Sequence, residues 1–242
     1  MATLQNRAKL QGHGMLADQT ANQTVASRHT TSPDVVTSDW QAGLPRLAGD
    51  GVTLREVQVS DAPALFAMLT TEEVARFISP PPTSVEGFER FIEWAQRERS
   101  AGRYICFAVV PAGHHTAVGI FQVRIADRGC AVAEWGFAIG SAFWGTGVFQ
   151  QAATPILTFT FDVLGVQRLE ARAAVANRRG NGALRKMGAV QEGVMRSSFL
   201  RGGVRMDQAM WAILAEDWRQ SKAVWGTRPG RGRVLAFTRT PV

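Results

Sequence analysis

The chain has 242 residues, of which 45% are hydrophobic, and a formal net charge of +7. This hydrophobic content is ordinary for a globular protein with a buried core, and we find neither an apolar run long enough to cross a bilayer nor a secretory leader. The positive charge is concentrated at one end, because residues 219–242 hold six basic and no acidic side chains. The charge therefore argues against a nucleic-acid-binding core and indicates a basic tail capable of weak contact with RNA or a ribosome.

The cysteines and histidines indicate neither a disulfide framework nor a metal site. Cys106 falls in a strand-like run and Cys130 in a turn, without CxxC spacing. Two unpatterned cysteines in a chain of this size are typical of a reducing compartment. The four histidines lack the spacing of metal ligands. We therefore expect a cytoplasmic protein with no metal and no membrane partner.

Composition divides the chain into three parts. Residues 1–43 are rich in Gln, Thr, Ser, Asn and Ala without a sustained apolar period. This predicts a disordered N-terminal extension, in which Met15 is an alternative start. The folded domain is expected over residues 44–218. Residues 219–242 are rich in Gly, Pro and Arg and are predicted to form a flexible basic tail.

The first half of the domain is predicted to contain a strand, two helices and three more strands. The first strand is expected at Val52–Val57. Ser60 is expected to cap the first helix, and the capping-box spacing of Thr83–Glu86 to start the second. Their apolar faces hold Leu65, Phe66 and Leu69 in the first helix and Phe88, Phe91, Ile92 and Ala95 in the second. Three strand-like runs joined by short hairpin turns follow, at Tyr104–Val110, Val118–Ala126 and Ala131–Ile139.

The second half of the domain begins with a turn that contains two glycines. A long helix is expected at Val148–Leu164 and a strand with alternating polarity at Arg168–Val175, followed by a short helix. Two strands at Val190–Leu200 and Arg205–Leu214 are joined by a turn at Arg201–Gly203. This order predicts one mixed α/β (α+β) domain, with a mostly antiparallel central sheet flanked by helices.

The turn between the Ala131–Ile139 strand and the long helix is the most informative feature of the chain. Gly145 and Gly147 allow the backbone to turn sharply and a bulky anion to come close. The helix start presents unpaired N–H groups at the positive end of the helix dipole, which binds phosphate without a cationic side chain. The turn therefore predicts a pyrophosphate site made by the backbone of Gly145, Thr146, Gly147, Val148 and Phe149.

Four motifs in the second half follow one another in a recognisable order: Trp144–Gly147, Asn177, Lys186–Gly188, and Glu192–Gly193 before Arg196. In this order they closely resemble the GNAT acetyltransferase superfamily, and within it the branch of the ribosomal-protein N-terminal (alanine/serine) acetyltransferases. The resemblance covers about residues 44–218. It implies the GNAT acyl-CoA N-acyltransferase fold, in which two strands part beside the loop and acyl-CoA lies between them.

The resemblance also implies an activity. We expect an N-acetyltransferase that moves an acetyl group from acetyl-CoA to a primary amine by direct attack in a ternary complex. The expected acceptor is a protein N-terminal α-amine, with a small amine such as an antibiotic or amino acid as the alternative. Both a monomer and a homodimer fit the sequence, and so does a longer acyl donor.

Several residues acquire expected roles from the resemblance. The backbones of Phe137, Ala138 and Ile139 are expected to pair with pantetheine, and the N–H of Phe137 or Ala138 to polarise the thioester. Asn177 is expected to contact the pantetheine arm, and as a helix N-cap it can do both. Asn181 is expected to reach the same edge of the cofactor.

Glu134 is the expected catalytic base, because it lies in the strand that leads to the pyrophosphate loop. The alternative is a strand glutamate that faces outward in an ion pair. The general acid is unidentified, since the family's serine and tyrosine positions hold Gly180 and Leu184, and Tyr104 lies in another strand. Phe149 also departs from the family, which commonly has Gly or Ala there.

Two other classes of function compete with acetyl transfer. A dinucleotide-binding oxidoreductase is suggested by Gly145-Thr146-Gly147 and the acidic Glu170 further on. It is disfavoured because Gln150 replaces the third glycine and too little chain follows for a doubly wound sheet. The other class is a CoA-binding or RNA-associated module without catalysis, which the missing acid and the basic tail would fit.

Overall fold

A computed structural model describes residues 39–127 and 129–226, so most of the expected N-terminal extension and the end of the tail lie outside the described residues. The described part contains an eight-stranded sheet in the order β1-β2-β3-β4-β5-β6-β8-β7. Every neighbouring pair is antiparallel except β5 and β6. The strands are β1 (Leu47–Gly49), β2 (Val52–Glu56), β3 (Tyr104–Pro111), β4 (Gly119–Ile125), β5 (Val132–Ile139), β6 (Arg168–Ala174), β7 (Val190–Arg201) and β8 (Val204–Leu214).

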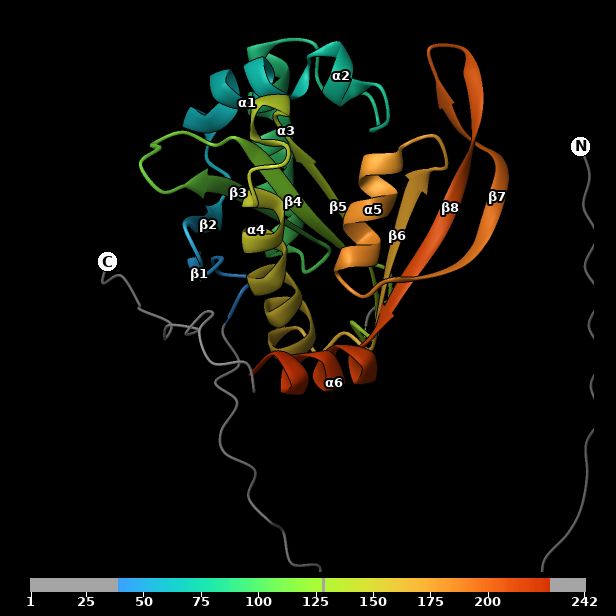
Figure 1. The fold of residues 1–242 in the computed structure, drawn as a ribbon. Helices are drawn as coiled ribbons and strands as arrows, with labels where there is room; N and C mark the ends of the chain where they lie inside the picture. Colours follow the sequence, from blue (N-terminus) through green and yellow to red (C-terminus); the bar gives the residue numbers. More distant parts are fainter. Residues whose placement is uncertain (1–38, 128, 227–242) are drawn as a thin grey trace, which may run out of the picture. The chain divides into compact units, whose positions relative to one another are not determined.

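Helices pack on both faces of this sheet (Figure 1). The helices are α1 (Ala62–Leu69), α2 (Glu72–Ala75), α3 (Val85–Ser100), α4 (Val148–Thr158), α5 (Arg178–Lys186) and α6 (Ala215–Gly226), and α4 continues into a π-helical turn at Phe159–Val163. The mixed, mostly antiparallel sheet confirms the predicted fold class. It also excludes a doubly wound dinucleotide-binding domain, because such a domain needs a mainly parallel sheet.

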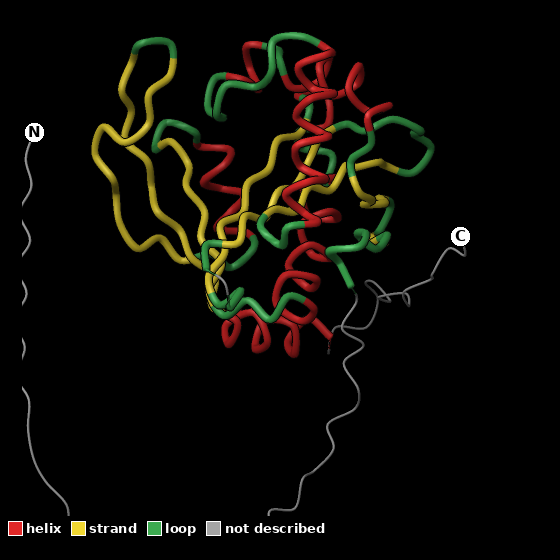
Figure 2. The backbone as a smooth tube through the Cα atoms, turned by 180° about the vertical axis from the view of Figure 1, so that it is seen from behind, coloured by secondary structure: helices red, strands yellow, loops and turns green. Residues whose placement is uncertain are grey.

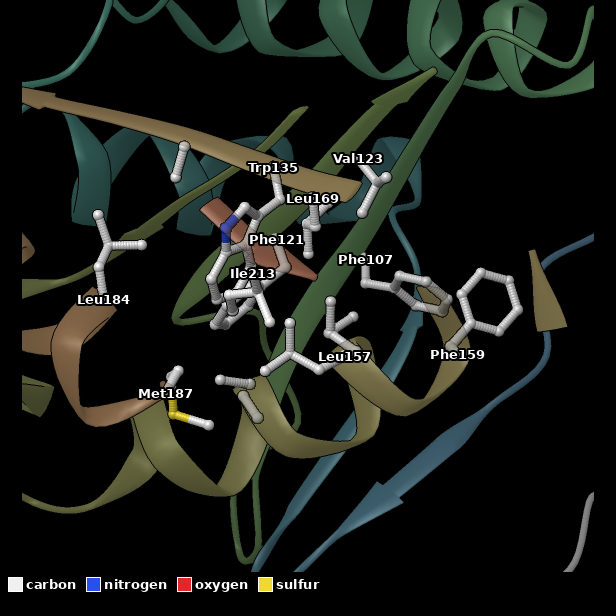
Figure 3. Close-up of a cluster of buried hydrophobic side chains, with 14 of the residues drawn as sticks. Phe107, Phe121, Val123, Trp135, Leu157, Phe159, Leu169, Leu184, Met187 and Ile213 are labelled. Carbon is white, nitrogen blue, oxygen red and sulfur yellow. The ribbon is translucent and has the colours of Figure 1, made fainter. Parts of the chain in front are cut away.

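Two hydrophobic clusters fill the space between the sheet and the helices. Side chains of β3 alternate between them: Ile105, Phe107 and Val109 pack with α4 on one face, and Tyr104 and Cys106 pack with α1 and α3 on the other. Figure 3 shows the α4 cluster, in which Phe107 meets the ring of Phe159. Burial on both faces explains why β3 is apolar along its whole length.

The start of α1 differs from the prediction. Ser60 lies inside a short 3₁₀ turn, and the N-cap position of α1 is occupied by Asp61. The Asp61 carboxylate is buried, accepts a hydrogen bond from the Gln58 N–H at 2.8 Å and pairs with Arg55 at 2.7 Å. Arg55 and the Gln58 N–H thus hold the Asp61 carboxylate in this turn. The order of residues along the chain did not reveal the contact with Arg55.

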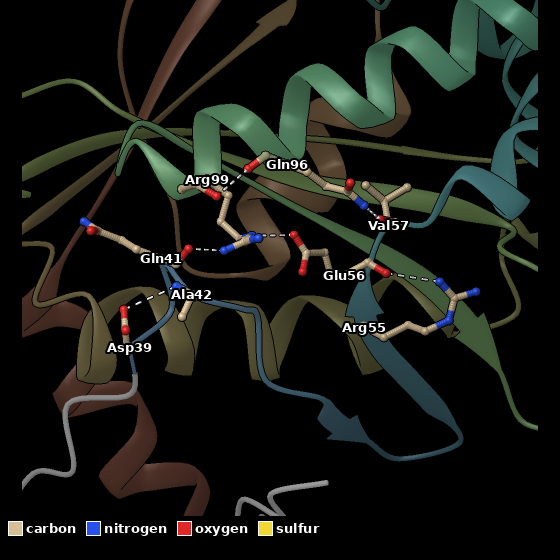
Figure 4. Close-up of polar contacts among 9 residues, drawn as sticks. Asp39, Gln41, Ala42, Arg55, Glu56, Val57, Gln96 and Arg99 are labelled. Atoms are coloured by element: carbon tan, nitrogen blue, oxygen red, sulfur yellow. Dashed lines mark hydrogen bonds and ion pairs between the residues drawn. The ribbon is translucent and has the colours of Figure 1, made fainter. Parts of the chain in front are cut away.

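The domain boundaries also need correction, since the fold uses residues on both sides of 44–218. Trp40 packs against the α4 cluster, and the Gln41 carbonyl accepts a hydrogen bond from Arg99 of α3 (Figure 4). At the other end, α6 runs to Gly226, so residues 219–226 are helical and not a flexible tail. Trp218 in this helix is 2% exposed and stacks on Phe161.

Candidate active site

Strands β5 and β6 part after a short paired stretch. They pair in parallel only between Val132–Glu134 and Arg168–Glu170. Beyond this point β5 stays paired with β4 as far as Ile139, and β6 stays paired with β8 as far as Ala174. Figure 1 shows the two strands together at one end and apart at the other. Among the residues that the structure describes, the facing edges of β5 and β6 beyond this stretch therefore have no strand partner.

The register shows which backbone groups of β5 face this gap. The Gly140 N–H bonds to the Val118 carbonyl at 2.8 Å, and the Ala126 N–H to the Val132 carbonyl at 2.9 Å. Because the direction of backbone groups alternates along a strand, even-numbered residues of β5 bond to β4. The N–H groups of Phe137 and Ile139 consequently point into the gap. The N–H of Ala138 points to β4, so the expected role for Ala138 as a thioester donor is wrong.

The facing edge of β6 is set by the same reasoning. The Val175 N–H bonds to the Asp207 carbonyl and the Ala215 N–H to the Gln167 carbonyl, each at 2.9 Å. Even-numbered residues of β6 therefore point toward β5. The backbone of Arg172 therefore also faces the gap, which was not expected from the sequence.

A cavity of about 550 Å³ passes through the sheet at this gap. On the face that carries α4 and α5, its lining includes Trp135, Ala171, Ala173, Gly180 and Leu184. On the opposite face, its lining includes Tyr104, Gln122, Arg124, Glu134, Gly136, Arg172 and the proline segment Pro80–Pro82. The half away from α4 and α5 thus carries the charged groups, beside apolar side chains such as Phe88 and Phe91, and the other half is apolar except for Asn177.

The glycine turn adopts the conformation that its two glycines permit. Gly145 has φ +77° and Gly147, the N-cap of α4, has φ +91°. The first helical hydrogen bond runs from the Gln151 N–H to the Gly147 carbonyl at 3.1 Å. The N–H groups of Val148 and Phe149 precede it and have no acceptor within the helix. Thr146 fixes the turn, since its hydroxyl donates to the Phe143 carbonyl at 2.7 Å.

Phe149 departs from the family without obstructing this turn. Its ring centroid lies 5.7 Å from that of Phe121 and 4.6 Å from that of Phe137, so the side chain belongs to the core. The loop is joined to α5 by a contact that the sequence analysis missed: the Arg179 guanidinium lies 3.6 Å from the ring centroid of Trp144. The Trp144 indole in turn donates to the Ile139 carbonyl at 2.8 Å.

Glu134 both lines the cavity and forms an ion pair. Its carboxylate lies 2.5 Å from the Arg124 guanidinium on the neighbouring strand, and its side chain is 25% exposed. Glu134 is therefore both an ion-paired strand residue and a residue of the cavity wall. Glu134 is three residues before Phe137, which corresponds to about 10 Å along a strand.

Tyr104 lies in the cavity wall, although the sequence placed it in a separate strand. It is directly opposite Arg124 in the register, and Arg124 is opposite Glu134. Burial raises the pKa of the Tyr104 phenol, so this group stays protonated and can serve as a hydrogen-bond donor on the polar side of the cavity.

The two asparagines near α5 have different roles. The Asn177 Oδ1 accepts from the Gly180 N–H at 2.9 Å, which confirms the N-cap, and Asn177 also lines the cavity. Asn181 instead closes the fold: its Nδ2 donates to the carbonyls of Ala174 and Asn177, and its Oδ1 accepts from the Trp211 indole at 2.9 Å. These contacts replace the expected cofactor contact of Asn181, because they occupy both its donor and its acceptor.

The β7–β8 hairpin adds residues that no motif indicated. A bulge at Ser197, with φ +52°, shifts the register between Met195 and Phe199. Figure 2 shows this hairpin at one edge of the sheet. Phe199 and Gln208 from this hairpin line the cavity beside Arg172. Strand alternation alone could not reveal them, because a bulge reverses the face on which later residues lie.

Two further findings concern the described residues as a whole. They contain no group of three or more His, Cys, Asp or Glu side chains placed to hold a metal ion. Within 39–127 and 129–226, no helix is both long and apolar enough to cross a membrane.

A family model described as "Acetyltransferase (GNAT) domain" matches residues 52–190. The Bacillus subtilis (strain 168) protein named "Uncharacterized N-acetyltransferase YoaA" is 25% identical over 174 residues, which are 71% of this chain and 97% of that protein.

Two solved structures share the fold. RimJ of Mycobacterium smegmatis, in complex with CoA-disulfide, is 20% identical with a TM-score of 0.65, and the match covers 75% of this chain and 93% of that one. The ribosomal-protein-S5-alanine acetyltransferase of Vibrio fischeri is 18% identical with a TM-score of 0.64, and the match covers 72% of this chain and 98% of that one.

Proposed function

Because the chain belongs to the GNAT acetyltransferase family, we propose that it transfers the acetyl group of acetyl-CoA to the α-amine of a protein N-terminus. The observation that carries this proposal is the cavity that passes through the sheet between β5 and β6. A thioester from the α4 face and an amine from the opposite face can meet in such a cavity. Their direct meeting is what a reaction in a ternary complex requires.

The chain's backbone fits acetyl-CoA, which when bound supplies the activated thioester. The N–H groups at the start of α4, from Gly147 to Phe149, hold the pyrophosphate through the positive end of the helix. The N–H groups of Phe137 and Ile139 offer the unpaired edge of β5 to the pantetheine amides. The Phe137 N–H polarises the thioester oxygen, since a fixed donor in a water-poor site stabilises developing negative charge.

Glu134 removes the proton from the acceptor ammonium through a water molecule. The ion pair with Arg124 at 2.5 Å holds the carboxylate in one orientation toward the cavity. Arg124 is 56% exposed, so solvent weakens the pair and leaves Glu134 able to act as a base.

A peptide N-terminus suits the polar half of the cavity better than a compact amine. This half lies between the Pro80–Pro82 segment and the β7–β8 hairpin, which contributes Phe199 and Gln208. These groups can contact an extended chain beyond its first residue. The name of the Vibrio fischeri enzyme, a ribosomal-protein acetyltransferase, supports the same acceptor class for this fold.

The cellular setting is part of this proposal. Cys106 is a buried free thiol and Cys130 is also free, which is consistent with the reducing cytoplasm. The basic residues after position 218 would add a weak, salt-dependent attraction to a ribosome. The proposal is compatible with both a monomer and a homodimer.

An acceptor screen tests the proposal. The chain is incubated with acetyl-CoA and either peptides with free N-termini, the same peptides with blocked N-termini, or small amines, and free CoA is measured. We expect CoA release with the free N-termini alone. Release with small amines alone would move the assignment to the small-amine class. Binding of acetyl-CoA without release in any arm would support a non-catalytic module.

A further inference from the structure

The departing sulfur needs a partner on the apolar side of the cavity. If the amine enters from the face of Glu134 and the carbonyl lies at the Phe137 N–H, the leaving group lies toward the face of α4 and α5. A thiolate in an apolar wall without a hydrogen-bond donor would be strongly disfavoured. Gly180 and Leu184 in this wall cannot donate from a side chain, and Asn177, which also lines the cavity, is held at the start of α5 by its Oδ1.

Trp135 supplies a buried donor in that wall. Trp135 is one of the residues that line the cavity, and it is 3% exposed. Within the described part of the chain, its Nε1–H finds no hydrogen-bond acceptor. Buried polar groups in proteins are rarely left unpaired, because an unmade hydrogen bond costs about 1–3 kcal/mol. The unpaired N–H therefore indicates that a bound ligand supplies the missing hydrogen-bond acceptor.

The indole is held in one orientation. Its ring stacks on Phe121 with centroids 6.1 Å apart and contacts Phe137 at 5.6 Å. Figure 3 shows the indole nitrogen turned toward the side of the cluster on which Leu184 lies. Thr160 is a useful contrast: its hydroxyl is also buried without a partner among the described residues, but it does not line the cavity.

We propose that the Trp135 Nε1–H donates a hydrogen bond to the coenzyme A sulfur as the thiolate leaves. The amine nitrogen forms a bond to the acetyl carbon, the carbon–sulfur bond breaks, and its electron pair remains on sulfur. The amine loses its proton by way of Glu134, whereas the indole keeps its own proton. Trp135 thus makes a general acid unnecessary, since a stabilised thiolate can leave and be protonated later by solvent. This inference rests on the proposed function.

The test compares coenzyme A with desulfo-coenzyme A, which lacks the sulfur, in the wild-type chain and in Trp135→Phe. Calorimetry is done below and above the thiol pKa of free coenzyme A. A hydrogen bond to an anion is worth about 1.5–3 kcal/mol, so above that pKa the variant should bind coenzyme A about 10- to 100-fold more weakly. Its affinity for desulfo-coenzyme A should stay unchanged at both pH values. Turnover should fall by a similar factor while the KM for acetyl-CoA stays within about twofold.

Trp40→Phe is the matched control, because it removes an indole outside the cavity and should change none of these values. Equal loss for both ligands would overturn the proposal, as would unchanged thiolate binding. If Trp135→Phe does not fold, the wild-type indole N–H signals are followed by NMR. One of them must shift with coenzyme A above its pKa and not with desulfo-coenzyme A; no such signal would also refute it. These binding readouts need no acceptor, so they remain valid if the acceptor screen fails.

Discussion

At the scale of single residues, Glu134 shows how one side chain can satisfy two interpretations. Its pairing with Arg124 is what a structural strand residue would show, and its position in the cavity wall is what a base would show. Contacts cannot separate these roles, because both hold the carboxylate in place. Kinetics can separate them.

Glu134→Gln should lower turnover by roughly 10²–10⁴-fold, the usual range for a positioned acid or base. Affinity for acetyl-CoA should change little, because backbone groups hold the cofactor. Raising the pH should partly restore the rate, since more of the acceptor amine is then neutral. Steady-state kinetics across pH measures both effects.

Glu170→Gln is the control for this variant. Glu170 lies opposite Glu134 in the register and is paired with Arg168 at 2.8 Å, but it does not line the cavity. Its substitution should leave turnover near the wild-type value. If the two variants lose activity equally, or if Glu134→Gln loses only stability, Glu134 is a structural residue.

At the scale of elements, the start of α4 is expected to act through its backbone. Gly147 is in the left-handed region, and an added Cβ there would meet only the end of the Gln151 side chain, at 3.7 Å. Asn and Asp both tolerate this conformation and have the same size. The pair Gly147→Asn and Gly147→Asp therefore changes charge and little else.

Gly147→Asp should weaken acetyl-CoA binding at least about tenfold relative to Gly147→Asn, because its carboxylate repels the pyrophosphate and occupies the positive end of the helix. Calorimetry at low salt measures the difference, which should shrink as salt is added. Equal affinities in the two variants would show that the pyrophosphate does not bind at this turn.

Helix α5 depends on Asn181 for its attachment to β6 and β8. Asn181→Ala would leave the Trp211 indole and the Ala174 and Asn177 carbonyls without this partner. We expect the free energy of unfolding to fall by about 1–3 kcal/mol. Urea denaturation measures the loss. Under conditions where the variant is folded, acetyl-CoA affinity should equal that of the wild type; a selective loss of affinity would restore the original expectation of a cofactor contact.

At the scale of the whole molecule, the fold begins before the boundary that composition predicted. A chain starting at residue 44 loses Trp40 from the α4 cluster and the Gln41 carbonyl from Arg99. Burying a large side chain contributes about 1.5–3 kcal/mol, and each kcal/mol is worth roughly 2–4 °C in a protein of this size. The chain starting at 44 should therefore melt at least about 3 °C below one starting at 39.

Calorimetric or fluorescence melting of the two truncated chains checks this prediction. Trp40→Ala in the full chain should reproduce most of the loss, which separates the tryptophan from the effect of a new terminus. Identical melting temperatures would show that residues 39–43 contribute nothing to the fold, and the boundary at 44 would stand.

Much of this architecture was accessible from local patterns. Alternation and helical periodicity predicted the strands from β2 to β8 and the helices α1, α3, α4 and α5, because burial of one face leaves a periodic trace in the sequence. The helices α2 and α6 and the short strand β1 were missed. Trp218 takes part in the core from a segment too polar on average to be distinguished from the basic tail.

The sequence by itself indicated the family, the parted-strand architecture and the position of the glycine turn before α4, because glycine spacing and motif order are properties of the local chain. Only the tertiary structure decided which groups face the gap. Pairing with β4 turns the Ala138 N–H away and leaves that of Phe137 free, a matter of register. Asn181 connects α5 to β8 because its Oδ1 accepts a hydrogen bond from the indole of Trp211, thirty residues later in the chain. Packing also buries Trp135, whose indole N–H has no hydrogen-bond partner among the described residues. These contacts join residues that lie far apart in the sequence, and the sequence alone carries no signal of such contacts.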